Sequence, residues 1–112
     1  MIISVFTSSH LRHKYLVSKL SNNFKKVLYI NENKPLVRIK QNPIIKTYFS
    51  KVKKAEIKIF KNKIKNKKNI TQINFKYGKI NAKKLLKNKT FLKSDIFLVF
   101  GSSIIKGVLL NF

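Results

Sequence analysis

The sequence of 112 residues has no cysteine, no tryptophan and only three acidic residues, Glu32, Glu56 and Asp95. Without cysteine the chain forms no disulfide, no thiolate metal site and no cysteine nucleophile, which fits a reducing compartment. Two histidines, His10 and His13, and three scattered acids supply too few ligands for a metal cage of carboxylates or imidazoles. The same shortage argues against the paired carboxylates of glycosidase chemistry.

Long apolar runs are also missing. Residues 1–7 lack the basic segment that begins an export signal, and their apolar run is too short for one. No stretch approaches the roughly 18 apolar residues of a membrane span. We therefore expect no membrane partner and a cytoplasmic location.

Positive charge dominates the composition. The chain has 26 lysine and arginine residues and a formal net charge of +23. Only Arg12 and Arg38 are arginines, and the 24 lysines accompany 12 asparagines and 15 isoleucines. Lysine, asparagine and isoleucine share codons made of A and T, so nucleotide bias explains much of the charge. A selected polyanion surface would more often use arginine, whose planar guanidinium binds phosphate and guanine with two hydrogen bonds.

A nucleic-acid partner is nevertheless an alternative. The hydrophobic fraction of 44% excludes a disordered basic tail, and the length excludes a multidomain enzyme. Lys61–Lys68 contains a single apolar residue, so it is the candidate contact for a polyanion, while the simpler interpretation is a solvated connector. The alternative function is that of a small lysine-rich nucleic-acid-binding protein, whose affinity falls steeply with salt.

The first thirty residues predict a strand, a helix and a second strand. Ile2–Phe6 is nearly all apolar, as in a strand buried on both faces, and the hydroxyl residues Thr7–Ser9 follow it as helix N-caps. Leu11–Phe24 then has apolar residues about four apart, which is typical of an amphipathic helix. Val27–Ile30 is a second strand, closed by a polar turn at 31–33. This order predicts an α/β fold with a Rossmann-like parallel sheet and flanking helices.

The middle of the chain is less regular. Apolar residues recur every three or four positions from Ile44 to Phe60 and predict one long helix after Pro43. Together with the lysine-rich loop that follows, it forms a helical and basic insertion over residues 34–69. A short strand is expected at 70–75, a turn at Gly78 and another helix over residues 82–91.

Ile96–Phe100 gives the strongest signal of a buried strand. Gly101–Ser103 ends this strand, and residues 104–110 predict a helix that starts there. An apolar segment at the very end of the chain leads us to expect one incomplete domain over residues 1–112. A further possibility is an interaction module that pairs through this exposed final segment.

Two loops are candidates for a binding site. In open α/β sheets, ligands bind at the carboxyl ends of the strands, where loops meet helix N-termini. Thr7–His10 and Gly101–Ser103 both follow a predicted strand and should lie on the same edge of the sheet. Ordinary helix capping is the alternative role of these hydroxyls, and exposed helical side chains are the simpler interpretation of His10 and His13. No G-x-G-x-x-G follows the first strand and no P-loop motif is present, which argues against a dinucleotide enzyme and a P-loop NTPase.

These segments also carry a family resemblance. Ser4–Leu20 resembles the start of the formyltransferase family that includes methionyl-tRNA and sugar formyltransferases, where a first strand runs into a Thr-Ser segment and an Arg-His pair. Ala55-Glu56 with Phe60 resembles the pattern of the family's long helix, and Gly78–Asn81 resembles its Gly-x-Ile-Asn turn. Asp95–Lys106 is similar to the Asp-strand-Phe-Gly-Ser-Ser-Ile-Ile segment ahead of the family's active site. The resemblance spans nearly the whole chain.

The resemblance implies an N-terminal domain that binds 10-formyltetrahydrofolate and takes part in moving its formyl group to a small-molecule amine. The residues implied for the donor cleft are Gly101, Ser102, Ser103 and Ile104. The residues implied for contact with the acceptor or a phosphate are Thr7, Ser8, His10 and Arg12.

The family's catalytic residues are not found in this sequence. They are an Asn and a His in an Asn-x-His motif and a later Asp, which stabilise the oxyanion of the tetrahedral intermediate and manage protons. This chain has no Asn-x-His segment, and His10 and His13 lie in the opening motif. We therefore expect no catalysis by the chain alone. It would be a truncated product, a decayed copy, or a half that needs a second polypeptide carrying the catalytic residues.

Overall fold

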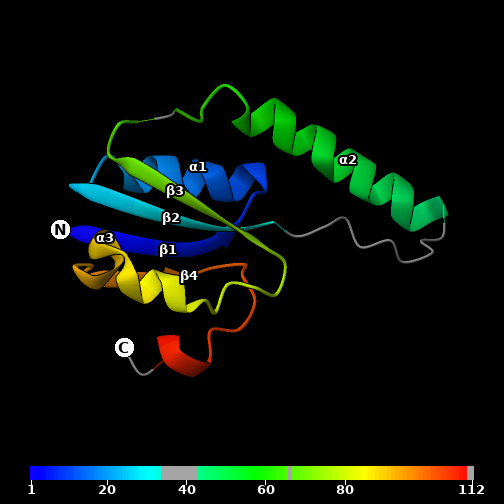
Figure 1. The fold of residues 1–112 in the computed structure, drawn as a ribbon. Helices are drawn as coiled ribbons and strands as arrows, with labels where there is room; N and C mark the ends of the chain where they lie inside the picture. The colour runs from blue at the N-terminus through cyan, green and yellow to red at the C-terminus, as the bar shows by residue number, and fades with distance from the viewer. Residues whose placement is uncertain (34–42, 66, 111–112) are drawn as a thin grey trace.

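A computed structural model describes residues 1–33, 43–65 and 67–110 (Figure 1). Four parallel strands form one sheet in the order β3-β2-β1-β4. They are β1 (Ile2–Ser8), β2 (Lys26–Asn33), β3 (Ile70–Lys76) and β4 (Ile96–Val99). The fold is therefore a Rossmann-like α/β sheet with flanking helices, as the sequence predicts, and it contains the first four strands of the 3-2-1-4-5-6 order of a doubly wound sheet.

Helical segments cover both faces of the sheet (Figure 1). The helix α1 (Leu11–Leu20) packs on one face. The helix α2 (Pro43–Phe60) contacts α1 through its carboxyl end, and its amino end projects away from the sheet (Figure 1). The other face carries the 3-10 segment η1 (Lys83–Lys87), the short helix α3 (Lys89–Leu92) and the 3-10 segment η2 (Gly107–Leu109). The long helix predicted after Pro43 is confirmed, whereas residues 34–42 of the predicted insertion lie outside the described residues.

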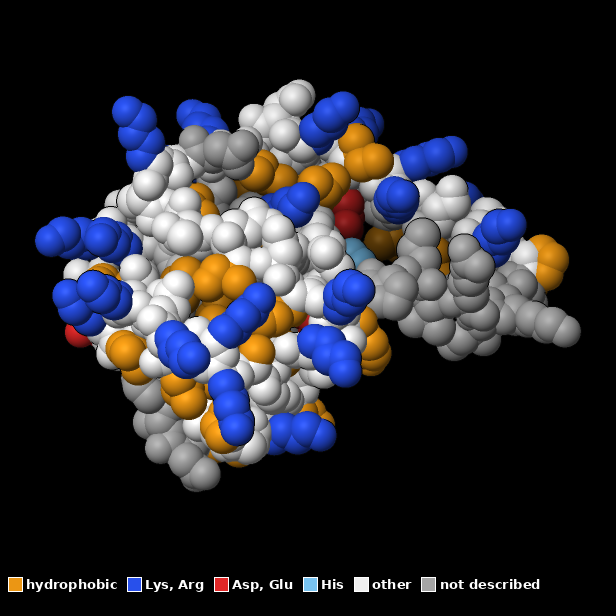
Figure 2. Space-filling view, in the orientation of Figure 1, with side chains coloured by type: hydrophobic (Ala, Val, Ile, Leu, Met, Phe, Trp, Pro, Cys, Tyr) orange, Lys and Arg blue, Asp and Glu red, His pale blue; other side chains and the backbone are white. Residues whose placement is uncertain are grey.

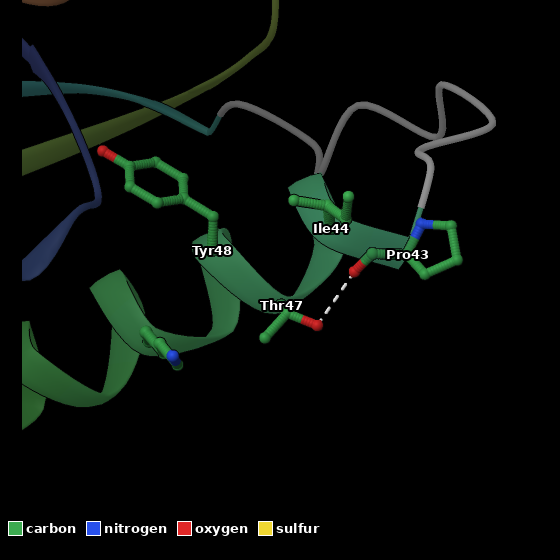
Figure 3. Close-up of a pocket in the computed structure, with 5 residues that line it drawn as sticks. Pro43, Ile44, Thr47 and Tyr48 are labelled. Atoms are coloured by element: carbon green, nitrogen blue, oxygen red, sulfur yellow. Dashed lines mark hydrogen bonds between the residues drawn. The ribbon is translucent and has the colours of Figure 1, made fainter.

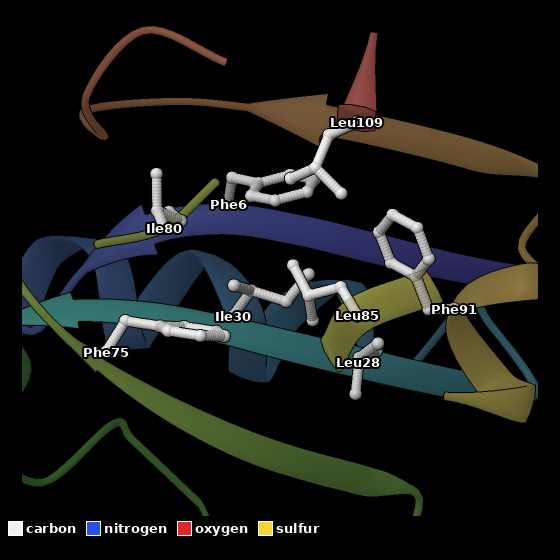
Figure 4. Packing of buried hydrophobic residues seen from close by; sticks show 8 residues of the cluster. All are labelled: Phe6, Leu28, Ile30, Phe75, Ile80, Leu85, Phe91 and Leu109. Atoms are coloured by element: carbon white, nitrogen blue, oxygen red, sulfur yellow. The ribbon is translucent and has the colours of Figure 1, made fainter. Parts of the chain in front are cut away.

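Each face of the sheet has its own hydrophobic core. Side chains of a strand alternate between the two faces, so Val27 and Tyr29 of β2 face α1, while Leu28 and Ile30 face η1 and α3. Figure 4 shows the second core, which consists of Phe6, Leu28, Ile30, Phe75, Ile80, Leu85, Phe91 and Leu109. The nearly continuous apolar runs of β1 and β2 are explained by this burial on both faces.

Four predictions about where strands end and helices form are wrong. Thr7 and Ser8 lie within β1, and residues 31–33 continue β2, because these polar residues pair in register as Thr7 with Asn31 and Ser8 with Glu32. The helix predicted over 82–91 is instead η1 followed by α3. No helix starts at Gly101: residues 103–106 are irregular and only η2 follows. Periodicity does not separate a regular helix from a 3-10 turn when the apolar residues are this close together.

The burial predicted for 96–100 is also wrong. β4 is an edge strand, and Ile96, Val99 and Phe100 are 39%, 51% and 50% exposed. Its pairing with β1 satisfies one side of its backbone, and the described residues place no further strand on the other side. The apolar run therefore predicts the strand correctly, but the strand is less buried than the run indicates.

Candidate functional site

The carboxyl ends of β1 and β4 meet at the edge of the sheet where the strand order changes direction. Phe6 pairs with Val99, and the Phe100 amide donates a hydrogen bond to the Phe6 carbonyl at 2.9 Å. Thr7–His10 and Gly101–Ser103 consequently lie side by side, as the sequence analysis predicts. In an open α/β sheet this switch point is the usual place of the ligand crevice.

His13 is buried at the switch point and is not an exposed helical side chain, so that interpretation is wrong. Only 4% of the residue is exposed. Its Nδ1 lies 2.5 Å from the Ser8 hydroxyl oxygen, and the Phe100 ring packs edge-on with a centroid distance of 5.0 Å. The side chain of His13, in the first turn of α1, points toward the junction of β1 and β4. The spacing of apolar residues in the sequence does not indicate this orientation.

Gly101 allows the chain to pass His13 at close range. Its φ of +72° lies in the left-handed region, which a glycine adopts at little cost. A Cβ at this position would lie 2.6 Å from the His13 Cε1 atom, closer than two carbon atoms approach. The backbone of the 101–106 loop thus lies directly against the imidazole. Both the positive φ and this close approach favour glycine at position 101.

Glu32 connects the 101–106 loop to the rest of the sheet, and the sequence analysis did not identify it. Its carboxylate is fully buried at the end of β2. Oε1 accepts hydrogen bonds from the Ser103 amide at 2.9 Å and the Ser103 hydroxyl at 3.0 Å, and Oε2 accepts one from the Gly78 amide at 3.1 Å. The available signal was an acid only two positions after the buried run Val27–Ile30. A carboxylate near a buried strand is stable only if hydrogen bonds compensate the cost of burying its charge.

Asn81 provides a second connection between the same two loops. Its side-chain amide donates to the Ile104 carbonyl at 2.9 Å and its Oδ1 accepts from the Lys106 amide at 2.7 Å. Glu32 and Asn81 therefore hold the Gly78–Asn81 turn against the 101–106 loop. These are two of the segments that carry the formyltransferase resemblance, and they are joined here across more than twenty residues of sequence.

The remaining predicted contacts differ in how accessible they are. Thr7 and Ser8 are buried, whereas His10 is exposed at the N-cap of α1, where its ring centroid is 5.5 Å from that of His13. The Arg12 guanidinium forms an ion pair with Glu56 of α2. Ser102 bonds to the neighbouring Ser103 carbonyl at 3.0 Å, and Ile104 is 82% exposed. Gly101–Ser103 and His10 therefore share this edge, while Arg12 faces α2.

The predicted capping role of the first hydroxyl segment is not what the structure shows. The N-cap of α1 is His10, with no side-chain hydrogen bond of its own to the helix. Ser8 lies instead against His13, and the Thr7 hydroxyl is buried without a hydrogen-bond partner among the described residues. A buried hydroxyl without a partner is uncommon in folded proteins and often marks a functional position.

The Tyr29 side chain holds the Ser8 carbonyl at the end of β1. Its hydroxyl donates to the Ser8 carbonyl at 2.6 Å and lies 3.3 Å from the Asn31 side-chain oxygen. The Asn31 amide donates in turn to Asn74 of β3 at 3.0 Å. Burial raises the pKa of Tyr29 to about 12, because the phenolate would lose its hydration.

We expect the stability of the chain to fall between pH 10 and pH 12 because of Tyr29. The unfolded chain releases the phenolic proton near pH 10, whereas the folded chain holds it until about pH 12, so rising pH favours the unfolded state. Urea unfolding of the wild type and Tyr29→Phe at several pH values measures the effect. The wild type should lose roughly 2 kcal/mol more than the variant over this range, and parallel pH profiles would contradict the assignment.

Two recesses lie away from the switch point. One of about 250 Å³ lies between α1 and the strands β2 and β3, and it is lined by Lys14, Val17, Ser18, Tyr29, Ile64, Lys65, Ile70 and Gln72. The other, of about 400 Å³, lies at the amino end of α2 (Figure 3). No group of three histidines or acids suited to a metal ion occurs within residues 1–33, 43–65 and 67–110.

Lysines are spread over the visible face of the molecule and do not gather in one patch (Figure 2). The Lys61–Lys68 segment is attached to α1, because the Lys65 amide donates to the Ser18 hydroxyl at 3.2 Å. Just after the segment, the Asn69 side chain donates to the carbonyl of Ser21, the C-cap of α1, at 2.8 Å. Most of its lysine side chains are exposed. The nucleic-acid contact at Lys61–Lys68 stays a prediction.

Comparisons with protein families, with curated proteins and with solved structures give no match for this chain. Within the described part of the chain, every helix is too short or too polar to cross a bilayer.

Proposed function

We propose that this chain binds 10-formyltetrahydrofolate at the β1–β4 switch point and forms the donor-binding part of a formyltransferase-like protein. The observation that carries the proposal is the joining of separate sequence segments at one edge. Gly78–Asn81 and the 101–106 loop are held together by Glu32 and Asn81, and Gly101 rests on His13 of the opening segment. Segments that resemble one family and then meet in space support a shared site.

The loop chemistry suits a flat heteroaromatic ring with a polar edge. Phe100 and Ile104 are 50% and 82% exposed, so they offer apolar contact surface next to the loop backbone. Ligand sites of this kind combine apolar walls with a few fixed polar groups. His10 and the buried Thr7 hydroxyl lie at the neighbouring loop, where we place contact with the acceptor amine or a phosphate.

Formyl transfer itself needs groups beyond those of this chain. The amine attacks the formyl carbon, the bond from that carbon to the folate nitrogen breaks, and a proton moves from the amine to the folate nitrogen. The oxyanion formed on the way requires hydrogen-bond donors and the proton requires a base. Since the Asn-x-His motif is missing from the sequence, we propose that a second polypeptide carries these groups.

The edge of β4 supports this need for a partner. Isolated sheet edges are normally protected by charged residues, proline or a covering segment. β4 has none of these in its own sequence, Ile-Phe-Leu-Val, and Ile96 and Val99 are substantially exposed. An apolar strand next to β4, with a helix over it, would bury these side chains and bring new residues to the switch point. The cysteine-free sequence suits a reducing compartment, and we propose that the chain works in the cytoplasm.

Calorimetric titration with a hydrolysis-resistant 10-formyl folate analogue tests the function. We expect saturable binding that Ile104→Asp weakens at least roughly tenfold, because the carboxylate removes apolar contact and repels the anionic ligand. Leu110→Asp is the matched control, since Leu110 is also exposed but belongs to the segment after η2, and it should leave the affinity unchanged.

Competition separates ring recognition from simple charge attraction. The folate tail alone, p-aminobenzoylglutamate, should not displace the analogue. Displacement by the tail, an equal effect of both aspartate variants, or no binding would refute the proposed donor site. Formyl transfer by the isolated chain would contradict the assignment of catalysis to a second polypeptide.

A further inference from the structure

The helix α2 differs from the rest of the molecule because none of its residues is buried. Its carboxyl end is attached to the body through the Arg12–Glu56 ion pair and a ring contact between Tyr15 and Phe60 with a centroid distance of 5.1 Å. The amino half projects past the sheet (Figure 1). A helix of 18 residues is thus presented to the surroundings along most of its length.

The sequence of α2 separates apolar from basic residues. With 3.6 residues per turn, one side of the helix carries an apolar stripe. We define the α2 stripe as Ile44, Ile45, Tyr48, Phe49, Val52 and Ile59. Ile44, Tyr48 and Phe49 are 79%, 62% and 52% exposed, which is an unusual amount of large apolar surface on one element. Figure 3 shows the side chains of Ile44 and Tyr48 extending from the first turns of the helix.

Lysines border the α2 stripe on both sides. The same helical geometry places Lys51 and Lys58 along one border and Lys46 and Lys53 along the other, with Lys54 on the opposite face. The single acid of the helix, Glu56, lies within the angular range of the stripe, but at the carboxyl end of the helix, where it is paired with Arg12. The recess at the start of α2 also combines apolar residues with a lysine, since Pro43, Ile44 and Tyr48 line it together with Lys51. The surface therefore fits an occupant that is apolar in the middle and anionic at both margins.

We propose that α2 is an interfacial helix that adsorbs to an anionic lipid surface. Helices that lie in the plane of a membrane have Lys or Arg on the polar face and aromatic and aliphatic residues on the other. The α2 stripe would enter the boundary between headgroups and acyl chains, and the bordering lysines would bind lipid phosphates. Adsorption requires no membrane-spanning length, so the prediction of no membrane partner, which was based on that length, does not apply to it.

The charge distribution favours a lipid surface over other occupants. A second copy of the chain would bring two net charges of +23 together. A nucleic acid would bind the lysines and stack on Tyr48 or Phe49, but it would leave aliphatic residues such as Ile44 in water. An extended anionic surface attracts the lysines that border the stripe, and it covers the aliphatic part of the stripe as well.

Insertion is measured with a tryptophan reporter, because the chain has no tryptophan of its own. Phe49→Trp should show a blue-shifted emission with vesicles in which about a third of the lipid is phosphatidylserine, and no shift with phosphatidylcholine alone. Tyr77→Trp is the matched control, since Tyr77 is 58% exposed in the turn after β3, and its emission should stay unchanged. No shift for Phe49→Trp, or the same shift for both, overturns the proposal.

Sedimentation with the same vesicles tests the two halves of the chemistry. Ile44→Ser with Tyr48→Ser, and separately Lys46→Gln, Lys51→Gln and Lys53→Gln together, should each weaken binding at least roughly tenfold. The triple variant Lys87→Gln, Lys89→Gln and Lys93→Gln removes equal charge from another exposed region and should cost much less. If both triple variants lose vesicle binding equally, binding depends on net charge alone and the proposal for α2 is overturned. Binding to single-stranded RNA that exceeds vesicle binding and survives the serine substitutions would also overturn the proposal.

Discussion

Replacing Gly101 with alanine is expected to destabilise the chain by about 3 kcal/mol. Two costs contribute to this value. A non-glycine residue in the left-handed region costs roughly 1–2 kcal/mol, and Gly101 has a φ of +72°. The added methyl group would also lie 2.6 Å from the His13 Cε1 atom, so the buried imidazole or the loop must move, at a further cost of roughly 1–3 kcal/mol. Urea unfolding followed by circular dichroism measures the change.

Gly107→Ala is the control that separates the two costs. Gly107 has a φ of +68°, nearly the same as Gly101, but a Cβ there would meet no atom within 4 Å. Its alanine variant should lose only the conformational part, about 1–2 kcal/mol. If both variants lose the same free energy of unfolding, Gly101 does not pack on His13 and the geometry proposed for the switch point is wrong.

Much of the fold follows from the sequence because burial on both faces leaves a clear pattern. The apolar runs at Ile2–Phe6 and Val27–Ile30 predict two strands, the four-residue spacing between them predicts α1, and this order predicts parallel pairing. The structure has all of these elements. The edge shared by Thr7–His10 and Gly101–Ser103 was predictable for the same reason, since parallel strands end on one side of a sheet.

The site is less predictable because its decisive contacts link residues far apart in the chain. His13 is polar and sits in a basic helix, so local pattern indicates solvent, whereas the neighbouring β4 brings Phe100 and Gly101 against it. Glu32 follows the predicted strand Val27–Ile30, so its sequence position indicates a turn. In the structure it lies in β2 and accepts hydrogen bonds from the Gly78 and Ser103 amides. For β4 the prediction errs in the opposite direction, because its apolar sequence indicates burial whereas the strand lies at the exposed edge of the sheet. Local patterns describe a residue's own element and not what lies beside it.

The second large effect is expected at Glu32. Truncation to alanine should cost about 3–4 kcal/mol, because it removes three hydrogen bonds to a buried charged acceptor, each worth roughly 1.5–3 kcal/mol before the gain from no longer burying the charge. Glu32→Gln keeps the shape but turns an amide N–H group toward a backbone or hydroxyl donor, so we expect a smaller loss of about 1–2 kcal/mol. Glu56→Gln is the control, since the Arg12–Glu56 pair lies at the surface and should contribute at most about 1 kcal/mol.

Amide hydrogen exchange distinguishes a role of Glu32 in positioning the 101–106 loop from a role in global stability alone. Oε1 of Glu32 binds the Ser103 amide and Oε2 binds the Gly78 amide, so Glu32→Gln must disturb at least one of these two backbone groups. Hydrogen exchange at Ser103 and Gly78 should accelerate in this variant under conditions where it is still folded, while the amides of β1 and β2 stay protected. The affinity for the 10-formyl folate analogue should fall in parallel, because a loop that samples several positions presents its binding geometry for less of the time. If exchange rises uniformly over the whole sheet, Glu32 contributes to global stability only and does not position the loop.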